Sequence, residues 1–299
     1  MLAGREPDYM ASVLFHGLAA VVGAEGVSEP CPSTHRTLGD SMNAACNSMA
    51  AGATQSWNGV GGNIDLFVIH NSHLRDTNGS WELALATRKA LPESCLVALI
   101  NGDDHTGPYP EPPFPVDFRF QRELLVDDYS AEPLLLAAPA GWVRCDKERV
   151  FDVCFLGAVD NEPRRQVAAM LAEQAGHGMK MFLGSGRLPW PQYMEVLRSS
   201  RIAVCPPGAG ADTMRMWEAL SAGCVVVPTA MPHRRWPPGT IALRHCDIGE
   251  LAWFLDAVHS GAYVIAPEEH QRTIDMFLKY HTTQARARQF LAHCGFIIE

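Results

Sequence analysis

The residues best suited to chemistry lie in one segment, Ile202–Pro228, which combines a Pro/Gly-rich turn with an arginine and a glutamate. Arg215 and Glu218 are three residues apart and share one face of a helix. A guanidinium group pairs with phosphate oxygens, and a carboxylate accepts hydrogen bonds from sugar hydroxyls. With the unpaired N–H groups of a helix start beside them, these side chains suit a nucleotide-sugar. The alternative is a surface ion pair beside an empty turn.

The elements that must position this pair are a strand, a turn, a helix and a second strand. Ile202–Cys205 is a short apolar run of the kind found in buried strands. Asp212 is a candidate N-cap for a helix over Thr213–Ala222, and Gly223 is a candidate stop. Cys224–Val227 is the next predicted strand. The turn lacks both the third glycine of a dinucleotide fingerprint and the Gly-Lys-Ser/Thr of a P-loop.

The whole segment resembles the donor-binding motif of exostosin-like glycosyltransferases and their GT-B relatives. Phe151–Gly157, followed by Arg164 and Arg165, resembles the opening of the C-terminal domain in that group. Three weaker matches resemble the N-terminal half of bacterial CgeB-like members: Asp8–Leu18, Asp65–His70 and Leu99–Asp104. The resemblance implies an α/β chain of two Rossmann-like domains facing a cleft. It also implies transfer of a sugar from a nucleoside diphosphate, with uridine the expected nucleoside.

Donor binding is expected from residues that follow the strands of the second half, because open α/β sheets bind ligands beyond the carboxyl ends of their strands. These residues are Gly157, Arg165, Gly184, Ser185, Pro207, Gly208, Thr213, Arg215 and Glu218. Arg165 and Arg215 are expected to neutralise the two phosphates in place of a metal ion. One of Arg164 and Arg165 is expected to be only a solvated residue of a helix start. Gly184 and Ser185 either contact the uracil or ribose or form a plain turn.

The resemblance also bears on stereochemistry. Glu218 resembles the acidic residue that accepts hydrogen bonds from ribose or donor-sugar hydroxyls in GT-B enzymes. Retaining GT-B families carry another glutamate eight positions earlier, where this chain has Gly210. This departure predicts an inverting reaction, which needs a general base on the acceptor hydroxyl.

The base is expected at the strand ends of the first half. Asp103 and Asp104 follow the predicted strand Cys95–Ile100, and His70 ends the predicted strand Ile64–His70. We expect Asp103 or Asp104 to be the base, with His70 as the second choice. The Asp-Asp pair is not taken as a metal site, because the phosphate-binding elements lie in the other half. No other cofactor is expected.

Strand and helix patterns alternate through both halves, which predicts parallel sheets covered on both faces. We expect an acceptor-side domain over 1–145 and a nucleotide-sugar-binding domain over 146–299, with the boundary within Gly141–Arg149. Pro267–His293 is predicted to be one long helix that packs back on the first domain. Less defined features are a strand near Val27, a helix over Ser41–Ala53, a proline-rich loop over Thr106–Pro115 and a strand over Ile241–Leu243.

The composition excludes several classes of function. With 299 residues, 47% of them hydrophobic and 19% charged, the chain is long enough for two well-packed domains. A net charge of −9 without basic clusters argues against a nucleic-acid surface. No apolar run reaches the roughly 18 residues of a membrane span, and no secretion signal is expected. Nine isolated cysteines indicate a reducing cytoplasm and no zinc site.

The expected activity is therefore a cytoplasmic, metal-independent glycosyltransferase acting on a nucleotide-sugar and a glycan or small-molecule acceptor. Two alternatives stay open. One is a catalytically inactive GT-B-like nucleotide-binding module, since no base is secure from the sequence. The other is a nicotinamide- or flavin-dependent Rossmann enzyme that uses the Gly-rich turn.

Overall fold

The computed structural model describes residues 9–23, 26–27, 64–76, 80–104, 111–125, 127–144, 147–184, 188–229 and 247–297. These residues form two compact units. Unit 1 contains the described residues up to Pro139 together with those from Thr282 onward, and unit 2 contains those from Ala140 to His281. Among the described residues each unit holds a four-stranded sheet, and all the strand pairs are parallel. The α/β class with two parallel sheets is confirmed.

The strands of unit 1 follow one another across the sheet in chain order. They are β1 (Leu66–His70), β2 (Leu96–Asn101), β3 (Phe118–Gln121) and β4 (Glu132–Pro133). The predicted strands Ile64–His70 and Cys95–Ile100 thus lie within two residues of β1 and β2. Because the order is consecutive, the described sheet has no point at which its connections reverse direction.

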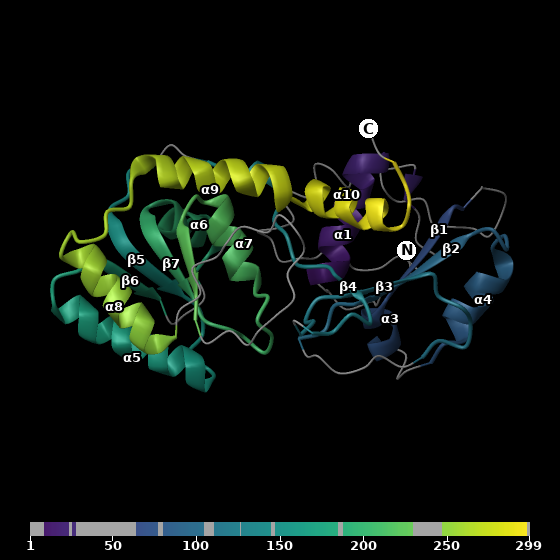
Figure 1. Ribbon diagram of the computed structural model, residues 1–299, viewed down its shortest axis with the longest axis horizontal. Coiled ribbons are helices and arrows are strands. Elements are labelled where there is room, and N and C mark those ends of the chain that lie inside the picture. Colours follow the sequence, from purple (N-terminus) through teal and green to yellow (C-terminus); the bar gives the residue numbers. More distant parts are fainter. Residues whose placement is uncertain are drawn as a thin grey trace. The chain divides into compact units, whose positions relative to one another are not determined.

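Helices cover both faces of the sheet in unit 1. Helix α4 (Glu82–Ala90) packs on one face, where Ala84 joins an apolar cluster with residues of β1 and β2. Helices α1 (Tyr9–Val22) and α10 (Thr283–His293) lie on the other face, and the short α3 (Asn71–Asp76) follows β1 directly (Figure 1). Phe120 of β3 contacts Phe290 of α10, with ring centroids 4.7 Å apart.

The strands of unit 2 are not in chain order. They are β5 (Phe151–Leu156), β6 (Met181–Gly184), β7 (Ser200–Cys205) and β8 (Val225–Pro228), arranged β6-β5-β7-β8. The chain runs from β5 to β6 on one side and then crosses to β7 on the other side of β5. The loops that follow β5 and β7 therefore leave in opposite directions, which makes this a topological switch point.

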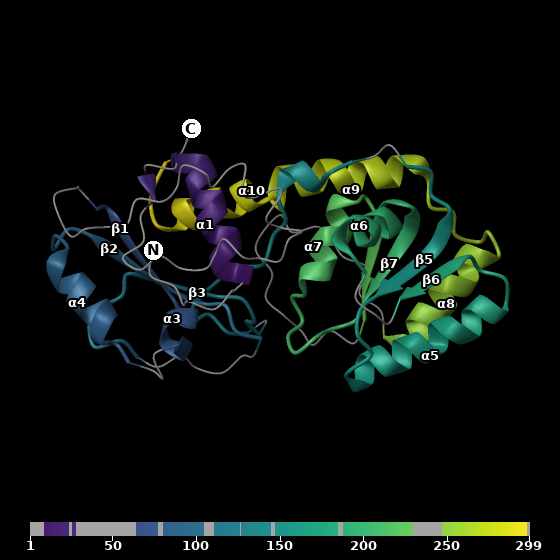
Figure 2. The same ribbon diagram turned by 180° about the vertical axis from the view of Figure 1, so that it is seen from behind.

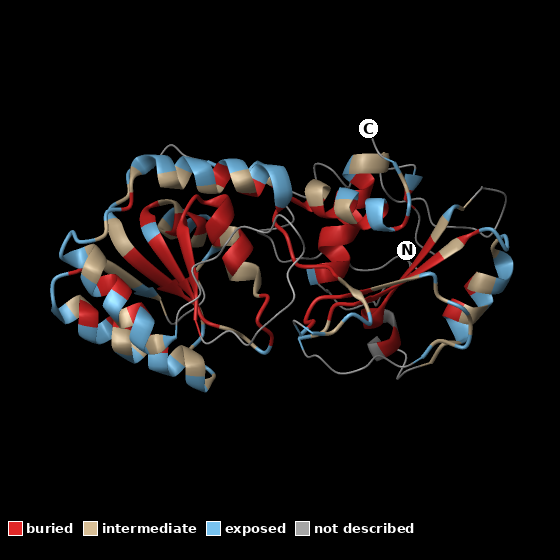
Figure 3. Cartoon of the chain, viewed as in Figure 1, coloured by how far each residue is buried: buried red, intermediate tan, exposed pale blue. Residues whose placement is uncertain are grey.

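Helices cover both faces of this sheet as well. Helices α5 (Glu162–Gly176) and α8 (Ile248–His259) cover one face, and α6 (Trp190–Arg198), α7 (Met214–Ser221) and α9 (Pro267–Tyr280) cover the other (Figures 1 and 2). The central strands are buried on both faces, whereas the outward faces of the helices are exposed (Figure 3). Five cysteines of the described residues are buried and form no disulfide: Cys95, Cys154, Cys205, Cys224 and Cys294.

The prediction of one helix over Pro267–His293 is wrong, because the chain forms α9 and α10 with a break at His281 and Thr282. The Thr282 hydroxyl accepts a hydrogen bond from the N–H of Ala285 at 3.1 Å and so caps α10. The break coincides with the passage from unit 2 to unit 1. A side-chain period continues through such a break, so the sequence pattern does not reveal it.

The predicted N-cap of α7 is also wrong. The helix begins at Met214 with Thr213 as N-cap, and Asp212 instead accepts a hydrogen bond from the indole of Trp217 at 2.6 Å. Gly223 ends this region with a φ of +74°, as expected for a glycine stop.

Some predictions fall outside the described residues. They concern the strand that would follow Val27, Ser41–Ala53, the start of the proline-rich loop, Ser185 and Ile241–Leu243. Within the described ranges, no helix is long and apolar enough to cross a membrane.

Candidate functional site

The switch point of unit 2 brings together residues from the loops after β5 and β7 and from the start of α7. Gly157 follows β5 with a φ of +150°, a conformation that favours glycine. A Cβ on Gly157 would overlap Nη2 of Arg215, so the guanidinium group lies directly on the backbone of this glycine. Gly157 and Arg215 were both predicted as donor-binding residues, and the structure places them in contact.

Two nitrogens of the Arg215 guanidinium group have no hydrogen-bonding partner among the described residues. Its Cζ lies 5.8 Å from the centroid of the Phe155 ring, a cation–π contact. Among the described residues its Nε and Nη1 are buried and bond to nothing. A buried donor without a partner is costly, and such groups are rare in folded proteins. Arg215 is therefore suited to an anion that would accept hydrogen bonds from both nitrogens.

Thr213 provides a second polar group of this kind two residues earlier. It is the N-cap of α7, but its side chain makes no capping hydrogen bond. Its Oγ1 is buried and has no partner in the part of the chain that the structure describes. A hydroxyl and a guanidinium group are therefore both available where the helix dipole is positive.

Glu218 lies one turn further along α7. Its Oε2 accepts a hydrogen bond from the hydroxyl of Tyr193, on α6, at 2.5 Å. Burial raises the pKa of the Glu218 carboxyl, while the Tyr193 hydrogen bond and the charge of Arg215 oppose the rise. Burial, followed by the charge of Glu218, holds the pKa of Tyr193 well above its usual value. Tyr193 was not predicted, since nothing in the sequence links it to Glu218 across 25 positions.

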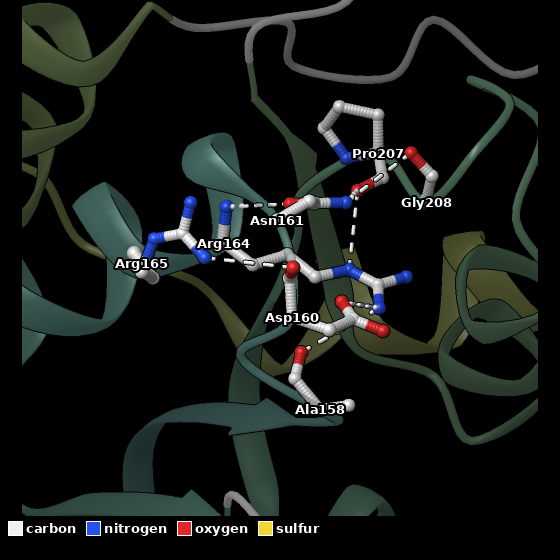
Figure 4. Close-up of polar contacts among 7 residues, drawn as sticks. All are labelled: Ala158, Asp160, Asn161, Arg164, Arg165, Pro207 and Gly208. Carbon is white, nitrogen blue, oxygen red and sulfur yellow. Dashed lines mark hydrogen bonds and ion pairs between the residues drawn. The ribbon is translucent and has the colours of Figure 1, made fainter.

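Asn161 and Arg164 fasten the loop after β7 to the start of α5 (Figure 4). The Asn161 Oδ1 accepts from the N–H of Arg164 at 3.0 Å, and its Nδ2 donates to the carbonyls of Pro207 and Gly208 at 3.2 and 3.3 Å. The Nε of Arg164 also donates to the Pro207 carbonyl, at 3.1 Å, and its Nη1 pairs with Asp160 at 2.9 Å. The predicted loop residues Pro207 and Gly208 are thus held by side chains of the neighbouring βα connection.

Arg164 and Arg165 point in different directions (Figure 4). A Cβ on Gly208 would lie 2.9 Å from Nη2 of Arg164, so this guanidinium group borders the Gly-rich loop. Arg165 is exposed and forms an ion pair with Glu162 at 3.0 Å. The structure therefore brings Arg164, rather than the predicted Arg165, to the loop. A proposed donor contact from Arg165 stays a prediction.

The remaining predicted donor residue is at the edge of the sheet. Gly184 ends β6, and its carbonyl accepts a hydrogen bond from the N–H of Gly157 at 3.0 Å. The backbone of Gly184 thus borders the same strand end as Gly157. Ser185 lies outside the described residues.

The predicted catalytic residues lie at the carboxyl ends of β1 and β2 in unit 1. His70 is fully buried, and its Nδ1 accepts a hydrogen bond from the N–H of Ser72 at 3.1 Å. A Cβ on Gly102 would lie 2.6 Å from its Nε2. Asp103 is half-buried, with its N–H bonded to Oδ1 of Asn101 at 3.1 Å. This neighbourhood encloses the imidazole of His70 but leaves Asp103 partly accessible.

Polar groups at this edge of unit 1 are bonded to one another. Asn71 donates to Oδ1 of Asn101 at 3.1 Å, which joins the loops after β1 and β2. Asp104 is exposed and forms an ion pair with Arg122, a buried residue just after β3. Arg122 was missed, and its position after a strand is the sequence signal that would have found it. Among the described residues, no group of three or more His, Cys, Asp or Glu side chains is placed to hold a metal ion.

Comparison with known proteins gives structural neighbours only. No protein-family model matches the sequence, and no curated protein compared with it is similar. A trehalose-6-phosphate synthase studied for "enzymatic glycosyltransfer with retention" has a TM-score of 0.50 at 11% identity, over 86% of this chain and 78% of that chain. At that identity the likeness shows the fold alone.

Two further neighbours have lower scores. The UDP-forming α,α-trehalose-phosphate synthase from Burkholderia vietnamiensis has a TM-score of 0.45 and 12% identity, over 84% of this chain and 75% of that chain. A structure described as a UDP-N-acetylglucosamine 2-epimerase from Listeria monocytogenes has a TM-score of 0.47 and 13% identity, over 97% and 94%. With its two parallel-sheet units, the chain is an α/β protein of the GT-B fold.

Proposed function

We propose that this protein is a glycosyltransferase that moves a sugar from a nucleoside diphosphate, with uridine as the nucleoside, to an acceptor hydroxyl. The observation that carries the proposal is the Arg215 guanidinium group at the switch point of unit 2, whose buried Nε and Nη1 bond to nothing in the described residues. A diphosphate supplies the acceptor oxygens that these nitrogens need. The resemblance of Ile202–Pro228 to the donor-binding motif of exostosin-like glycosyltransferases supports the same interpretation.

The donor is proposed to lie across the loops after β5 and β7. Its diphosphate would meet Arg215, Thr213 and the N–H groups at the start of α7, close to the backbone of Gly157 and Gly208. Arg164 borders the same loop and would add positive charge. Glu218 would accept a hydrogen bond from a hydroxyl of the ribose or of the transferred sugar.

Catalysis is proposed to use a carboxylate of unit 1. Asp103 or Asp104 takes the proton of the acceptor hydroxyl, whose oxygen then bonds to the anomeric carbon. The bond from that carbon to the diphosphate breaks, and the leaving oxygen keeps the electron pair beside Arg215. The backbone N–H of Ser72 already occupies Nδ1 of His70, which favours the aspartates over His70 as base. Gly210 supports inversion, and the anomeric configuration of the product tests it.

A nucleotide panel tests the proposal directly. UDP and UDP-sugars are expected to raise the unfolding temperature, since a ligand at 100 times its Kd stabilises by about 2.7 kcal/mol. Arg215→Ala should remove this shift while leaving unfolding of the free protein cooperative. Stabilisation by NAD but not by UDP would contradict the proposal and favour a nicotinamide-dependent enzyme.

The pairing of Asp104 with Arg122 and the burial of His70 favour one alternative, a nucleotide-binding module without catalytic activity. The two functions differ in one measurement. A transferase hydrolyses or transfers the sugar of its donor during a long incubation, whereas the inactive module binds the donor and returns it unchanged.

A further inference from the structure

The carboxylate of Glu218 is engaged on one side only. Its Oε2 accepts the hydroxyl hydrogen of Tyr193, which reaches it from the adjacent helix α6. Its Oε1 accepts no hydrogen bond from the described part of the chain. Arg215 lies one turn earlier on α7. The Oε1 of Glu218 and the unbonded Nε and Nη1 of Arg215 therefore belong to one helix. The two groups are spaced to meet neighbouring parts of one ligand.

The ring of Tyr193 is fixed independently of its hydroxyl. It stacks on Trp190, with centroids 5.5 Å apart and planes at 16°. Trp190 in turn contacts Trp142, with centroids 4.6 Å apart, and Trp142 is buried. Aromatic contacts of this kind contribute beyond their buried area and hold a ring in one orientation. The aromatic packing of the Tyr193 ring therefore places its hydroxyl next to Glu218, independently of the hydrogen bond between them.

We propose that Tyr193 is a positioning residue that holds the Glu218 carboxylate with Oε1 presented to a hydroxyl of the nucleotide-sugar. This inference rests on the proposed function and adds to it a residue on α6 that makes no contact with the donor. The ligand class it specifies is a nucleoside diphosphate with a free ribose or sugar hydroxyl. A deoxygenated analogue lacks the group that Oε1 accepts and is expected to bind more weakly.

Electrostatics give Tyr193 a second effect on the same carboxylate. Burial disfavours the ionised form of Glu218, and a donated hydrogen bond favours it. A Glu218 that has lost the Tyr193 hydroxyl holds its proton to higher pH. A protonated Oε1 no longer serves as a charged acceptor, so donor affinity falls as pH falls through the pKa of Glu218.

The experiment compares Tyr193→Phe with Tyr263→Phe by titrating UDP and UDP-glucose calorimetrically from acidic to neutral pH. Tyr263 is the matched control, because its hydroxyl also donates to a glutamate of unit 2, Glu269, at 3.5 Å. Tyr193→Phe is expected to weaken binding roughly 10-fold, as for a lost hydrogen bond to a charged group. It should also move the acid midpoint of binding to higher pH. Tyr263→Phe should change neither. An effect on UDP-glucose but not on UDP would support the proposal and assign the hydroxyl to the sugar.

Unchanged affinity and an unchanged acid midpoint in Tyr193→Phe would overturn the positioning role and leave the proposed function standing. Failure of the unaltered protein to bind any nucleotide diphosphate would overturn both. If Tyr193→Phe does not fold, Glu218→Asp takes its place, since it withdraws the carboxylate from the Tyr193 hydroxyl by one methylene. A similar loss of affinity is expected, and wild-type affinity would overturn the proposal. Adding Tyr193→Phe to Glu218→Gln should cause no further loss.

Discussion

The carboxyl edges of the two sheets carry similar polar residues that differ in how far they bond to one another. In unit 1 the polar groups bond to one another, as Asn71 does with Asn101 and Asp104 does with Arg122. In unit 2, Thr213 and Arg215 keep buried atoms that bond to nothing in the described residues. The edge of unit 1 also holds such an atom, the Nε of Arg122, but the Nη2 of that arginine pairs with Asp104. At the edge of unit 2, Nε and Nη1 of Arg215 both lack an acceptor in the described residues.

The difference indicates at which edge a bound ligand would supply more of the missing hydrogen bonds. Burying a polar group is costly unless it is hydrogen-bonded, and a ligand that supplies the missing partner relieves that cost. Topology contributes, because the strand order of unit 2 separates the loops after β5 and β7, whereas the described strands of unit 1 are consecutive. An anion is therefore expected to bind at the edge of unit 2.

The largest expected effect concerns turnover. Asp103→Asn and Asp104→Asn test whether the edge of unit 1 supplies the base. Loss of the base is expected to slow transfer roughly 100-fold or more, with donor affinity unchanged because that site lies in unit 2. Transfer rates and UDP affinity are measured on the same preparations. Full activity in both variants would refute a base at these positions.

Arg122 and Arg215 offer a direct contrast in stability. Arg122→Met leaves Asp104 without its partner and Glu123, which is fully buried, without the nearby cation. It is expected to lower the free energy of unfolding by about 3 kcal/mol. Arg215→Met removes two buried nitrogens that lack partners in the described residues, together with the contact to Phe155, and is expected to cost less stability than Arg122→Met. Urea denaturation measures both variants, and equal destabilisation would remove the contrast between the two edges.

Two glycines test how closely each edge depends on its backbone. Gly157→Ala places a methyl group against the Arg215 guanidinium group at a positive φ, and Gly102→Ala places one against His70. Both are expected to lose about 1 to 3 kcal/mol of stability. Only Gly157→Ala should also weaken UDP binding, because it displaces Arg215. Loss of UDP affinity in Gly102→Ala would contradict the separation of roles.

The smallest expected effect is a pH dependence that originates in unit 2. Burial raises the pKa of Glu218 above the ordinary value of 4.5, so the folded state binds this proton more tightly than the unfolded state. Stability from this group is present below that ordinary pKa and is lost as pH rises through the raised pKa. Glu218→Gln should flatten this part of the stability profile. An identical profile in the variant would show that the pKa of Glu218 is not raised.

Local patterns predicted five elements to within two residues: β1, β2, β7, α7 and β8. They did so because strand and helix periods and glycine stops are local properties. The break between α9 and α10 was not predicted, because the helical pattern of apolar residues continues across it. That pattern does not show that the side chain of Thr282 caps α10. Asp212 was predicted to be the N-cap of α7, but its Oδ1 accepts a hydrogen bond from the indole N–H of Trp217 instead. A hydrogen-bond donor on the next turn of the helix thus outweighs the preference of aspartate for the N-cap position.

The same division holds for the candidate site. The sequence by itself determined the α/β class and predicted Gly157, Arg215 and Glu218 as candidate donor-binding residues. These follow from short-range spacing along β5, β7 and α7. Only the tertiary structure decided that Arg164 faces the loop, that two nitrogens of Arg215 bond to nothing in the described residues, and that Tyr193 bonds to Glu218. These contacts join side chains on separate helices and strands, and tertiary packing decides which of those side chains meet.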